Sequence, residues 1–474
     1  MTNEITANIC VIGGGSGGLS VAAGASQMGA EVVLVEGAKM GGDCLNYGCV
    51  PSKSMIAAAN AAHAIRSADR FGIDAAEPNV DFRKVHDHVH GVIGAIAPHD
   101  SVERFEGLGV RVIQEKGKFV GPNRVQAGDT VITAKRIVVS TGSHAGAPPI
   151  PGLDSVPYLT NETVFDRTEA PAHLLVIGGG PIGSELSQAH RRLGCDVTIL
   201  DIAKTLNNDD PELTEVVRTR MLKEGIVIRE EIEILSVEKD GAGVAVNIRD
   251  NGKEERVTGS DLLVAAGRVP NLDGLDLEAA GIEYDRRGIK VDARLRTTNK
   301  KVFAIGDAAG SFQFTHVAGY HAGIVIRNVL FRLPAKVDYS ALPWVTYTDP
   351  ELAHVGMTEK QAREKHGDIR ILRHPFAEND RAQAERDTEG LAKIVTTAKG
   401  VIVGASIVGP HAGELIQPWI LPIQKKMKIG AVVGLIIPYP TLGEVNKRAA
   451  GSFYTPKLFS EKTKKIVRFL SKLG

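Results

Sequence analysis

Two segments of this chain repeat the same structural unit, and that repeat leaves few folds open. Segments 8–36 and 173–201 align without a gap, and each contains an apolar strand, a GxGxxG turn, a helical stretch and a second strand that ends in an acid. The glycines and terminal acids of the two copies are Gly13, Gly15, Gly18 and Glu36, and Gly178, Gly180, Gly183 and Asp201. The repeat therefore predicts two Rossmann-like units, each built on a parallel sheet.

Each glycine of this unit has its own physical role. The first allows a tight turn, the second lets backbone approach a pyrophosphate, and the third lets the helix pack on the strand. The helix N-terminus offers amides and a partial positive charge to the phosphates, and the acid accepts hydrogen bonds from ribose hydroxyls. We therefore expect two bound dinucleotides. In the second site Asp201 favours NAD over NADP, because it repels a 2′-phosphate, although the nearby Lys204 weakens this preference.

A pair of cysteines follows the acid of the first unit. The stretch GGDCLNYGCVPSK, residues 41–53, contains Cys44 and Cys49, and a zinc site there would need a second ligand pair. The pair is either a structural accident or a redox-active disulfide. A dithiol beside one dinucleotide site, with a second site downstream, favours an electron path from nicotinamide through flavin to a disulfide. This order assigns the flavin to the first site.

Composition excludes several classes of protein. The 56 basic and 56 acidic residues cancel, which argues against a nucleic-acid-binding protein. Four cysteines in 474 residues do not make the disulfide framework of a secreted domain. The N-terminus lacks the pattern of a signal peptide, and the apolar run at 429–438 is far shorter than the ~20 residues of a membrane helix. We expect a cytoplasmic protein without membrane contact.

Further motifs point to a known family. They are STGS (140–143), VAAGRVPN (264–271), FAIGDAAG (303–310) and FTHVAGYHAG (314–323). With the cysteine motif they resemble the class I pyridine nucleotide–disulfide oxidoreductases, which include dihydrolipoamide dehydrogenase, glutathione reductase and mercuric reductase. The resemblance covers nearly the whole chain. It implies an α/β fold with two Rossmann-like dinucleotide-binding domains and a C-terminal α+β dimerisation domain.

The resemblance also implies where these domains lie. Residues 1–150 and 272–343 form an FAD-binding domain, and residues 151–271 form an NAD(P)-binding domain. Residues 344–474 form the dimerisation domain with a basic C-terminal helix. The family is a homodimer with shared active sites, so the last domain completes the site of the partner subunit.

The same resemblance implies roles for individual residues. Electrons pass from the nicotinamide to FAD, then to the disulfide of Cys44 and Cys49, and on to a small-molecule or protein-borne dithiol or disulfide. Cys49 faces the flavin and Cys44 faces the substrate, while Lys53 lies beside the reactive nitrogen of the flavin and pairs with Glu185. A helix that starts near Pro51 favours the Cys49 thiolate. Other cofactor contacts implied by the motifs are Gly42, Thr141, Gly142, Gly267, Asp307, His316 and Ala318.

One position departs from the family pattern and bears on the substrate. Disulfide-reducing members carry a histidine before Pro-Thr near the C-terminus and a glutamate five residues later. The matching stretch IIPYPTLGE, residues 436–444, retains Glu444 but has Tyr439 at the histidine position. Histidine titrates near ~6.5 and tyrosine near ~10, so tyrosine is a poor base at neutral pH. His411 is a weak substitute, and Asp43, where many relatives have threonine, is a smaller departure.

Three functions remain compatible with these residues. The first is a dihydrolipoamide dehydrogenase-like reaction with a thiol or disulfide substrate that tolerates Tyr439. The second is reduction of metal ions or other oxidants, since mercuric reductases resemble this chain in having tyrosine there, although their vicinal C-terminal cysteine pair is missing. The third is a flavoprotein sensor or complex subunit with vestigial catalysis, which the intact Cys44, Cys49, Lys53 and Glu185 oppose.

Two lesser features involve other charged groups. His86 and His90 have the helical i,i+4 spacing that permits chelation, but no partner ligand is evident, so we expect no metal site. The tail from Lys457 carries six basic residues and one acid, and its apolar residues form a helical stripe. That stripe is formed by Ile466, Phe469, Leu470 and Leu473. We expect this helix to pack on the dimer, and docking to a partner or to an anionic surface is the alternative.

Overall fold

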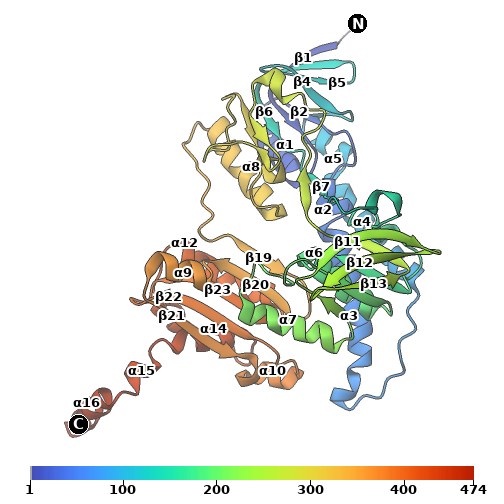
Figure 1. Ribbon diagram of the computed structural model, residues 1–474. Helices are drawn as coiled ribbons and strands as arrows, with labels where there is room; N and C mark the ends of the chain where they lie inside the picture. The colour runs from blue at the N-terminus through green and yellow to red at the C-terminus, as the bar shows by residue number, and fades with distance from the viewer. Residues whose placement is uncertain (1–2, 474) are drawn as a thin grey trace.

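The computed structural model describes residues 3–473, which form three bodies around separate sheets (Figure 1). The first sheet has the strand order β3-β2-β1-β6-β5-β4, with β18 also paired to β6. Its strands are β1 (Asn3–Ile12), β2 (Val32–Val35), β3 (Val110–Ile113), β4 (Gly117–Gly121), β5 (Arg124–Ala127), β6 (Thr130–Val139) and β18 (Val302–Ala304). All neighbours are parallel except at β4 and β5. The chain therefore returns to this sheet after residue 300.

Both faces of the first sheet are buried, as its continuous apolar strands require. On β1, Ile9 and Val11 pack toward α1 (Ser16–Gln27) and α8 (Thr315–Val329), whereas Cys10 and Ile12 pack on the opposite face. Cys10 is completely buried.

The second body repeats the parallel arrangement. Its sheet has the order β10-β9-β8-β14, and an antiparallel sheet β11-β12-β13 lies beside it. The strands are β8 (His173–Ile177), β9 (Asp196–Leu200), β10 (Val227–Arg229), β11 (Glu233–Asp240), β12 (Gly243–Asp250), β13 (Lys253–Gly259) and β14 (Asp261–Val264). The helices α6 (Pro181–Arg192) and α7 (Pro211–Lys223) belong to this body. Helices α3 (Cys49–Arg66) and α4 (Phe82–Ile96) contribute Met55 and Val89 to its core.

The third body is a five-stranded antiparallel sheet with the order β19-β20-β23-β22-β21. Its strands are β19 (Pro343–Thr346), β20 (Glu351–Gly356), β21 (Ile369–Pro375), β22 (Leu391–Thr397) and β23 (Ile402–Gly409). Its helices include α9 (Glu359–His366), α10 (Asp380–Glu385), α12 (Gln417–Gln424) and α14 (Glu444–Gly451). Trp419 is completely buried, and its indole nitrogen donates to Asn446 Oδ1 at 2.9 Å. The predicted fold class is confirmed: two Rossmann-like units and a C-terminal α+β domain.

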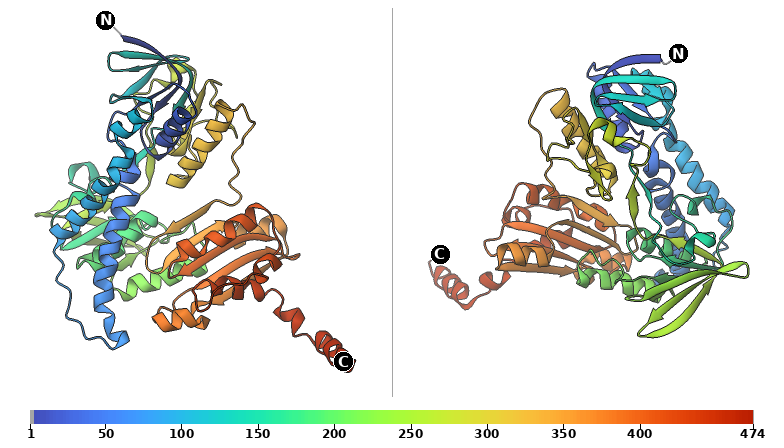
Figure 2. Two further views of the ribbon diagram at one scale, coloured as in Figure 1. Left: turned by 180° about the vertical axis from the view of Figure 1, so that it is seen from behind. Right: turned by 45° about the horizontal axis from the view of Figure 1, so that its top comes forward.

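The chain ends in two short helices that leave the third body, α15 (Thr455–Leu458) and α16 (Glu461–Leu470) (Figures 1 and 2). Within residues 3–473, none of the helices combines the length and the apolar character that crossing a membrane requires.

A buried arginine joins the three bodies. Arg192, at the end of α6, is 3% exposed, and its guanidinium lies 2.6 Å from Glu224 Oε1 and 2.8 Å from Asp349 Oδ2. It also donates to Asn60 Oδ1 on α3 at 2.6 Å. Asp349 precedes β20 of the third body, and its backbone exchanges two 2.7 Å hydrogen bonds with the Gln188 side chain on α6. These contacts fix α3, α6 and the third sheet against one another.

We expect Arg192→Met to destabilise the fold by about 3–5 kcal/mol, because it leaves two partly buried carboxylates without their partner. The effect is measured by thermal and urea unfolding, with flavin release and circular dichroism as the two readouts. Arg381→Met is the matched control: Arg381 pairs with Glu385 on the exposed surface of α10, and we expect a change of at most ~1 kcal/mol. Equal stabilities of the two variants would contradict a structural role for the buried cluster.

Candidate active site

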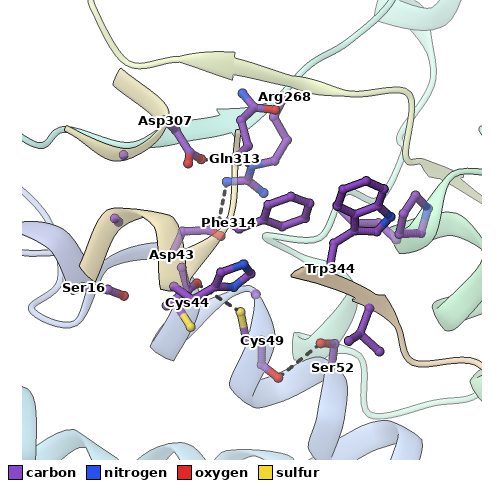
Figure 3. Close-up of a pocket in the computed structure, with 18 of the residues that line it drawn as sticks. Ser16, Asp43, Cys44, Cys49, Ser52, Arg268, Asp307, Gln313, Phe314 and Trp344 are labelled. Atoms are coloured by element: carbon purple, nitrogen blue, oxygen red, sulfur yellow. Dashed lines mark hydrogen bonds and ion pairs between the residues drawn. The ribbon is translucent and has the colours of Figure 1, made fainter. Parts of the chain in front are cut away.

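A cavity of about 790 Å³ lies where the three bodies meet, and nine of the predicted site residues line it (Figure 3). The first glycine turn contributes Gly15 and Ser16, and the cysteine motif contributes Cys44, Cys49 and Lys53. Helix α6 of the second body contributes Pro181 and Glu185, and β19 of the third body contributes Trp344. The cavity therefore touches both glycine turns and the thiol pair at once.

The two thiols come from consecutive helices. Cys44 lies in α2 (Gly42–Asn46), and Cys49 is the first residue of α3. The helix thus begins two residues before Pro51, closer to the thiol than the sequence indicated, and the partial positive charge of its N-terminus lies at Cys49 itself. Both cysteines are free thiols; Cys44 is half-buried, Cys49 is exposed to the cavity, and its Sγ lies 3.4 Å from Thr315 Oγ1.

The two thiols differ in acidity because they hydrogen-bond to each other. The hydrogen bond from Cys44 is the largest cause that lowers the pKa of Cys49, to about 6, and the Thr315 hydroxyl and the charge of Lys53 lower it further against the opposing effect of burial. The same contact, together with burial, raises the pKa of Cys44. At neutral pH the reduced pair therefore holds one thiolate, at Cys49, and one thiol, at Cys44.

Lys53 and Glu185 lie 132 residues apart in the chain and form an ion pair beside Cys49. Lys53 Nζ is 2.7 Å from Glu185 Oε2, and the Glu185 side chain is only 7% exposed. The other Glu185 oxygen accepts a hydrogen bond from the Tyr347 backbone at 2.9 Å, and Lys53 Nζ lies 4.3 Å from the centre of the Tyr347 ring. The predicted pairing is present, with the lysine ammonium held at the cavity wall.

The glycine turns have the space that a dinucleotide needs. A Cβ on Gly18 would meet Gly13 O at 1.9 Å, and a Cβ on Gly183 would meet Gly178 O at 1.9 Å, so helix and turn are in direct contact there. Gly13 and Gly178 have φ values of +106° and +104°, which disfavour a side chain. A Cβ on Gly180 would meet nothing within 4 Å, and one on Gly15 only Gly42 Cα at 3.7 Å. The space in front of the uncapped N-termini of α1 and α6 therefore suits a pyrophosphate.

The two terminal acids hold the glycine turns in matching ways. Glu36 accepts the amides of Gly14 at 2.5 Å and Ala38 at 2.6 Å. Asp201 accepts the amides of Gly179 at 2.5 Å and Ala203 at 2.8 Å. Each carboxylate is thereby fixed at the end of its second strand, where the ribose of a bound dinucleotide belongs.

The two segments in which the chain passes between the first and second bodies, residues 140–143 and 264–271, meet beside the cavity. Strands β7 (Ser143–Ala145) and β15 (Arg268–Pro270) pair antiparallel, and Thr141 Oγ1 donates to Asn271 O at 2.7 Å. The glycines of these segments, Gly142 and Gly267, have φ values of +70° and +130°. Asp307 accepts a 2.5 Å hydrogen bond from Ser143 Oγ, and its burial raises the pKa of the carboxyl group.

The start of α8 lies beside the first glycine turn. His316 Nε2 lies 2.9 Å from Pro343 O, so this ring is held toward the third body. Ala318 lies under the first turn, since a Cβ on Gly17 would meet its methyl group at 3.2 Å and one on Gly306 would meet it at 3.1 Å.

The structure adds residues that the sequence did not single out. The Arg268 guanidinium lies 3.0 Å from Asp43 Oδ1 and donates to Ser143 Oγ at 2.8 Å, and Figure 3 shows it across the cavity from the thiols. Asn161 Nδ2 reaches the same Asp43 oxygen at 3.3 Å. Thr315 contacts Cys49 as described above. Arg268 and Thr315 lie inside the quoted motifs, but only the fold shows that Asp43 has an arginine partner.

Tyr439 and Glu444 do not join this cavity within one chain. Tyr439 is 69% exposed, and its hydroxyl donates to Asp380 Oδ2 at 2.9 Å, which raises the pKa of the phenol. Glu444 begins α14 and lines a separate surface pocket with His374 and Arg448. Within one chain both residues lie apart from the thiol pair, so a site shared with a partner subunit stays a prediction.

Two of the histidines of α4 lie beside each other. The rings of His86 and His90 lie 4.2 Å apart, and His90 Nε2 lies 3.2 Å from Phe165 O. Within the part of the chain that the structure describes, no three His, Cys, Asp or Glu side chains gather as metal ligands.

A thiol pair between two dinucleotide turns defines a dithiol oxidoreductase that works with two dinucleotide cofactors. Comparison with known proteins gives the family. Residues 7–322 match the pyridine nucleotide-disulphide oxidoreductase family, and residues 342–450 match its dimerisation domain. The chain belongs to this family. It is an FAD-dependent enzyme that exchanges electrons between a pyridine nucleotide and a disulfide, and the dimerisation domain indicates a homodimer.

The individual relatives are named after different reactions. A mercuric reductase from Bacillus cereus is 34% identical over 446 residues, covering 94% of this chain and 71% of the relative. A dihydrolipoyl dehydrogenase from Geobacillus stearothermophilus is 35% identical over 454 residues, covering 93% and 94%. Among solved structures, the HOCl-induced flavoprotein disulfide reductase RclA from Escherichia coli has a TM-score of 0.85 at 26% identity, covering 94% of this chain and 99% of that one. LpdA from Mycobacterium tuberculosis has a TM-score of 0.86 at 26% identity, covering 95% and 99%.

Proposed function

We propose that Cys44 and Cys49 are the redox-active pair of an NADH-dependent, dihydrolipoamide dehydrogenase-like oxidoreductase. The observation that carries the proposal is the single acidic thiol, Cys49, at a helix N-terminus beside the Lys53–Glu185 pair. FAD, when bound, supplies the step between a hydride donor and a dithiol. Lys53 then stabilises negative charge next to Cys49, and Glu185 holds Lys53 in place. Cys44, which stays protonated, faces the substrate side.

We assign FAD to the first glycine turn, with residues 1–150 and 272–343, and the pyridine nucleotide to residues 151–271. Asp307 supports this assignment, because it follows β18 of the first sheet and lines the same cavity as Gly15. Residues 344–474 form the dimerisation domain and supply Tyr439 and Glu444 to the partner's site. The cytoplasmic location expected from the sequence stays a prediction.

We expect NADH to be used at least ~10-fold better than NADPH, measured as kcat/KM. The Asp201 carboxylate, fixed by two amides, repels a 2′-phosphate at short range, and ~10-fold corresponds to about 1.4 kcal/mol. Asp201→Asn should reduce this preference. Asp196→Asn, which removes an exposed carboxylate at the start of β9, the strand that Asp201 follows, should leave the preference for NADH unchanged. Equal use of both nucleotides by the wild type would contradict the assignment.

Tyr439 narrows the proposed substrate class. Its hydroxyl donates to Asp380 and its pKa is raised, so the phenol stays protonated and serves as a donor rather than as a base. We infer a small-molecule or protein-borne dithiol or disulfide whose reaction does not depend on a base at this position.

Reduction of metal ions is the second candidate. Tyr439 favours it, as do the relatives named mercuric reductase and a structure of RclA described as its Cu(II) complex. The chain supplies no second reactive thiol pair for this task. Cys10 and Cys195 are completely buried, and burial raises the pKa of each to about 12. The thiolate ligands of a metal ion would therefore come from Cys44 and Cys49 alone.

The test is anaerobic mixing of the FAD-loaded enzyme with NADH, followed by addition of one oxidant at a time. Rapid bleaching of the flavin, and reoxidation by lipoamide or another disulfide, support the proposal. Reoxidation by Hg(II) or Cu(II) only supports the second candidate. A flavin that neither NADH nor NADPH reduces contradicts both and favours the sensor or complex-subunit function.

A further inference from the structure

The C-terminal tail is a helix that the rest of the chain does not cover. The match to the dimerisation domain ends at residue 450, and α16 begins eleven residues later, at Glu461. Ser460 caps the helix by accepting the Thr463 amide at 3.3 Å, and Lys464 pairs with Glu461 at 2.8 Å. Both views in Figure 2 show the helix standing away from the third sheet. None of its residues is buried.

One side of this helix is apolar and open to solvent. Its side chains are 48% to 63% exposed, and most recur at the i, i+3 and i+4 positions that share one helical face. They are Ile466, Val467, Phe469 and Leu470, and Leu473, which is 69% exposed, lies three residues past the end of the helix. Phe459, just before the helix, is 70% exposed. A face of this kind costs free energy in water and requires a covering surface.

The opposite side of the helix is basic. Lys464 and Arg468 lie four residues apart, Lys465 lies one turn before Arg468 on the same side, and Lys472 follows two residues past the end of the helix. From Lys457 onward the tail has six basic residues and one acid, whereas the whole chain has 56 of each. The positive charge is therefore a local property of this helix.

We propose that α16 lies in the surface of an anionic phospholipid bilayer, with its apolar side at the acyl boundary and its basic residues at the headgroups. Charge complementarity favours this occupant over a second copy of the chain. A helix that docks on protein leaves its polar side in water, where clustered positive charges do not strengthen the contact. Anionic headgroups, in contrast, attract every basic side chain. The helix is too short to span the bilayer, and it need only lie on it. A homodimer carries two such helices, and two weak attachments together make a firm one.

The experiment is co-sedimentation of the full-length FAD-loaded enzyme with vesicles, with flavin absorbance reporting the bound fraction. One set of vesicles is phosphatidylcholine alone, and the other also contains phosphatidylglycerol. We expect binding to the second set, weakened by salt. The triple variant Lys464→Gln, Lys465→Gln, Arg468→Gln should bind it roughly 100-fold more weakly, at about fivefold for each basic residue. The double variant Phe469→Asp, Leu470→Asp should bind neither set.

The matched control removes three exposed basic residues of the first body, Lys135→Gln, Arg136→Gln and Lys301→Gln, and should bind as the wild type does. Flavin reduction by NADH should be the same in every variant, because α16 lies far from the cavity. Wild-type enzyme that stays in the supernatant at low salt would overturn the proposal. So would a Phe469→Asp, Leu470→Asp variant that keeps its vesicle binding but dissociates into monomers, since the apolar side would then cover the partner subunit.

Discussion

The Cys49→Ser enzyme is expected to lose NADH-dependent disulfide reduction by more than ~10³-fold while its flavin is still reduced by NADH. A serine hydroxyl cannot form the disulfide that accepts the electrons, so the path to the substrate is broken at that atom. The glycine turns, Lys53 and Glu185 are unchanged, so nucleotide binding and the first electron transfer should persist. Rapid-mixing spectroscopy measures the first step, and steady-state oxidation of NADH with lipoamide measures the whole path.

Cys10→Ala is the control for that experiment, because Cys10 is a buried core thiol on the far face of β1. It should retain turnover. A Cys49→Ser enzyme that still reduces disulfides would show that the electrons leave by another route, and the proposed role of the pair would be wrong.

The acidity of Cys49 can be measured separately in a Cys44→Ser enzyme, where the serine hydroxyl can replace the hydrogen bond that Cys44 donates. A thiolate beside an oxidised flavin gives long-wavelength absorbance. With a pKa of about 6, Cys49 becomes a thiolate as the pH rises through that value, so the absorbance should be present at pH 7 and lost below pH 6. A midpoint near ~8.5, the value of an unperturbed cysteine, would contradict the stabilisation of the thiolate.

The second large effect is expected at Tyr439. Tyr439→His should increase the NAD-linked oxidation of dihydrolipoamide at neutral pH by about 10²–10⁴-fold, the usual contribution of general acid–base catalysis. The wild-type phenol stays protonated because it donates to Asp380, whereas an imidazole titrates near ~6.5 and accepts a proton at working pH. Stopped-flow and steady-state assays of both enzymes with the same preparation of dihydrolipoamide measure the change.

Tyr439→Phe is the control, since it removes the hydroxyl and adds no base. If the wild type already oxidises dihydrolipoamide rapidly, Tyr439 is no obstacle and the dihydrolipoamide dehydrogenase-like function stands without modification. If the wild type is nearly inert and histidine restores turnover, the natural substrate is another one, and metal ions, reactive oxidants and protein disulfides become the compounds to test.

Much of the site could be predicted because its residues lie in short motifs with fixed local geometry. The glycine turns follow from steric demands that act within a few residues, and Gly13, Gly18, Gly178 and Gly183 are where a Cβ would collide or the backbone would be strained. The thiols lie close together because only four residues separate them. The pairing of Lys53 with Glu185 spans 132 residues, and only the resemblance to a family made it predictable.

Other parts of the site depend on distances that no local pattern encodes. In the sequence, Asp43 is notable only because many relatives have threonine at this position. The fold places Arg268 and Asn161 against it. Thr315 reaches Cys49 across 266 residues, and Asp380 reaches Tyr439 across 59. Each of these contacts joins segments that only the folded chain brings together, which is why spacing and composition did not reveal them.

The long helix that starts at Cys49 has a mechanical consequence. With 18 residues, α3 is a rod of about 27 Å, and its side chains pack into the core of the second body, where Arg192 bonds to Asn60. A hinge between the two Rossmann-like bodies would have to bend this rod or pull the reactive sulfur away from its neighbours. The two Rossmann-like bodies therefore keep a fixed arrangement, in which nucleotide and substrate diffuse in and out while the redox groups of the protein stay in position.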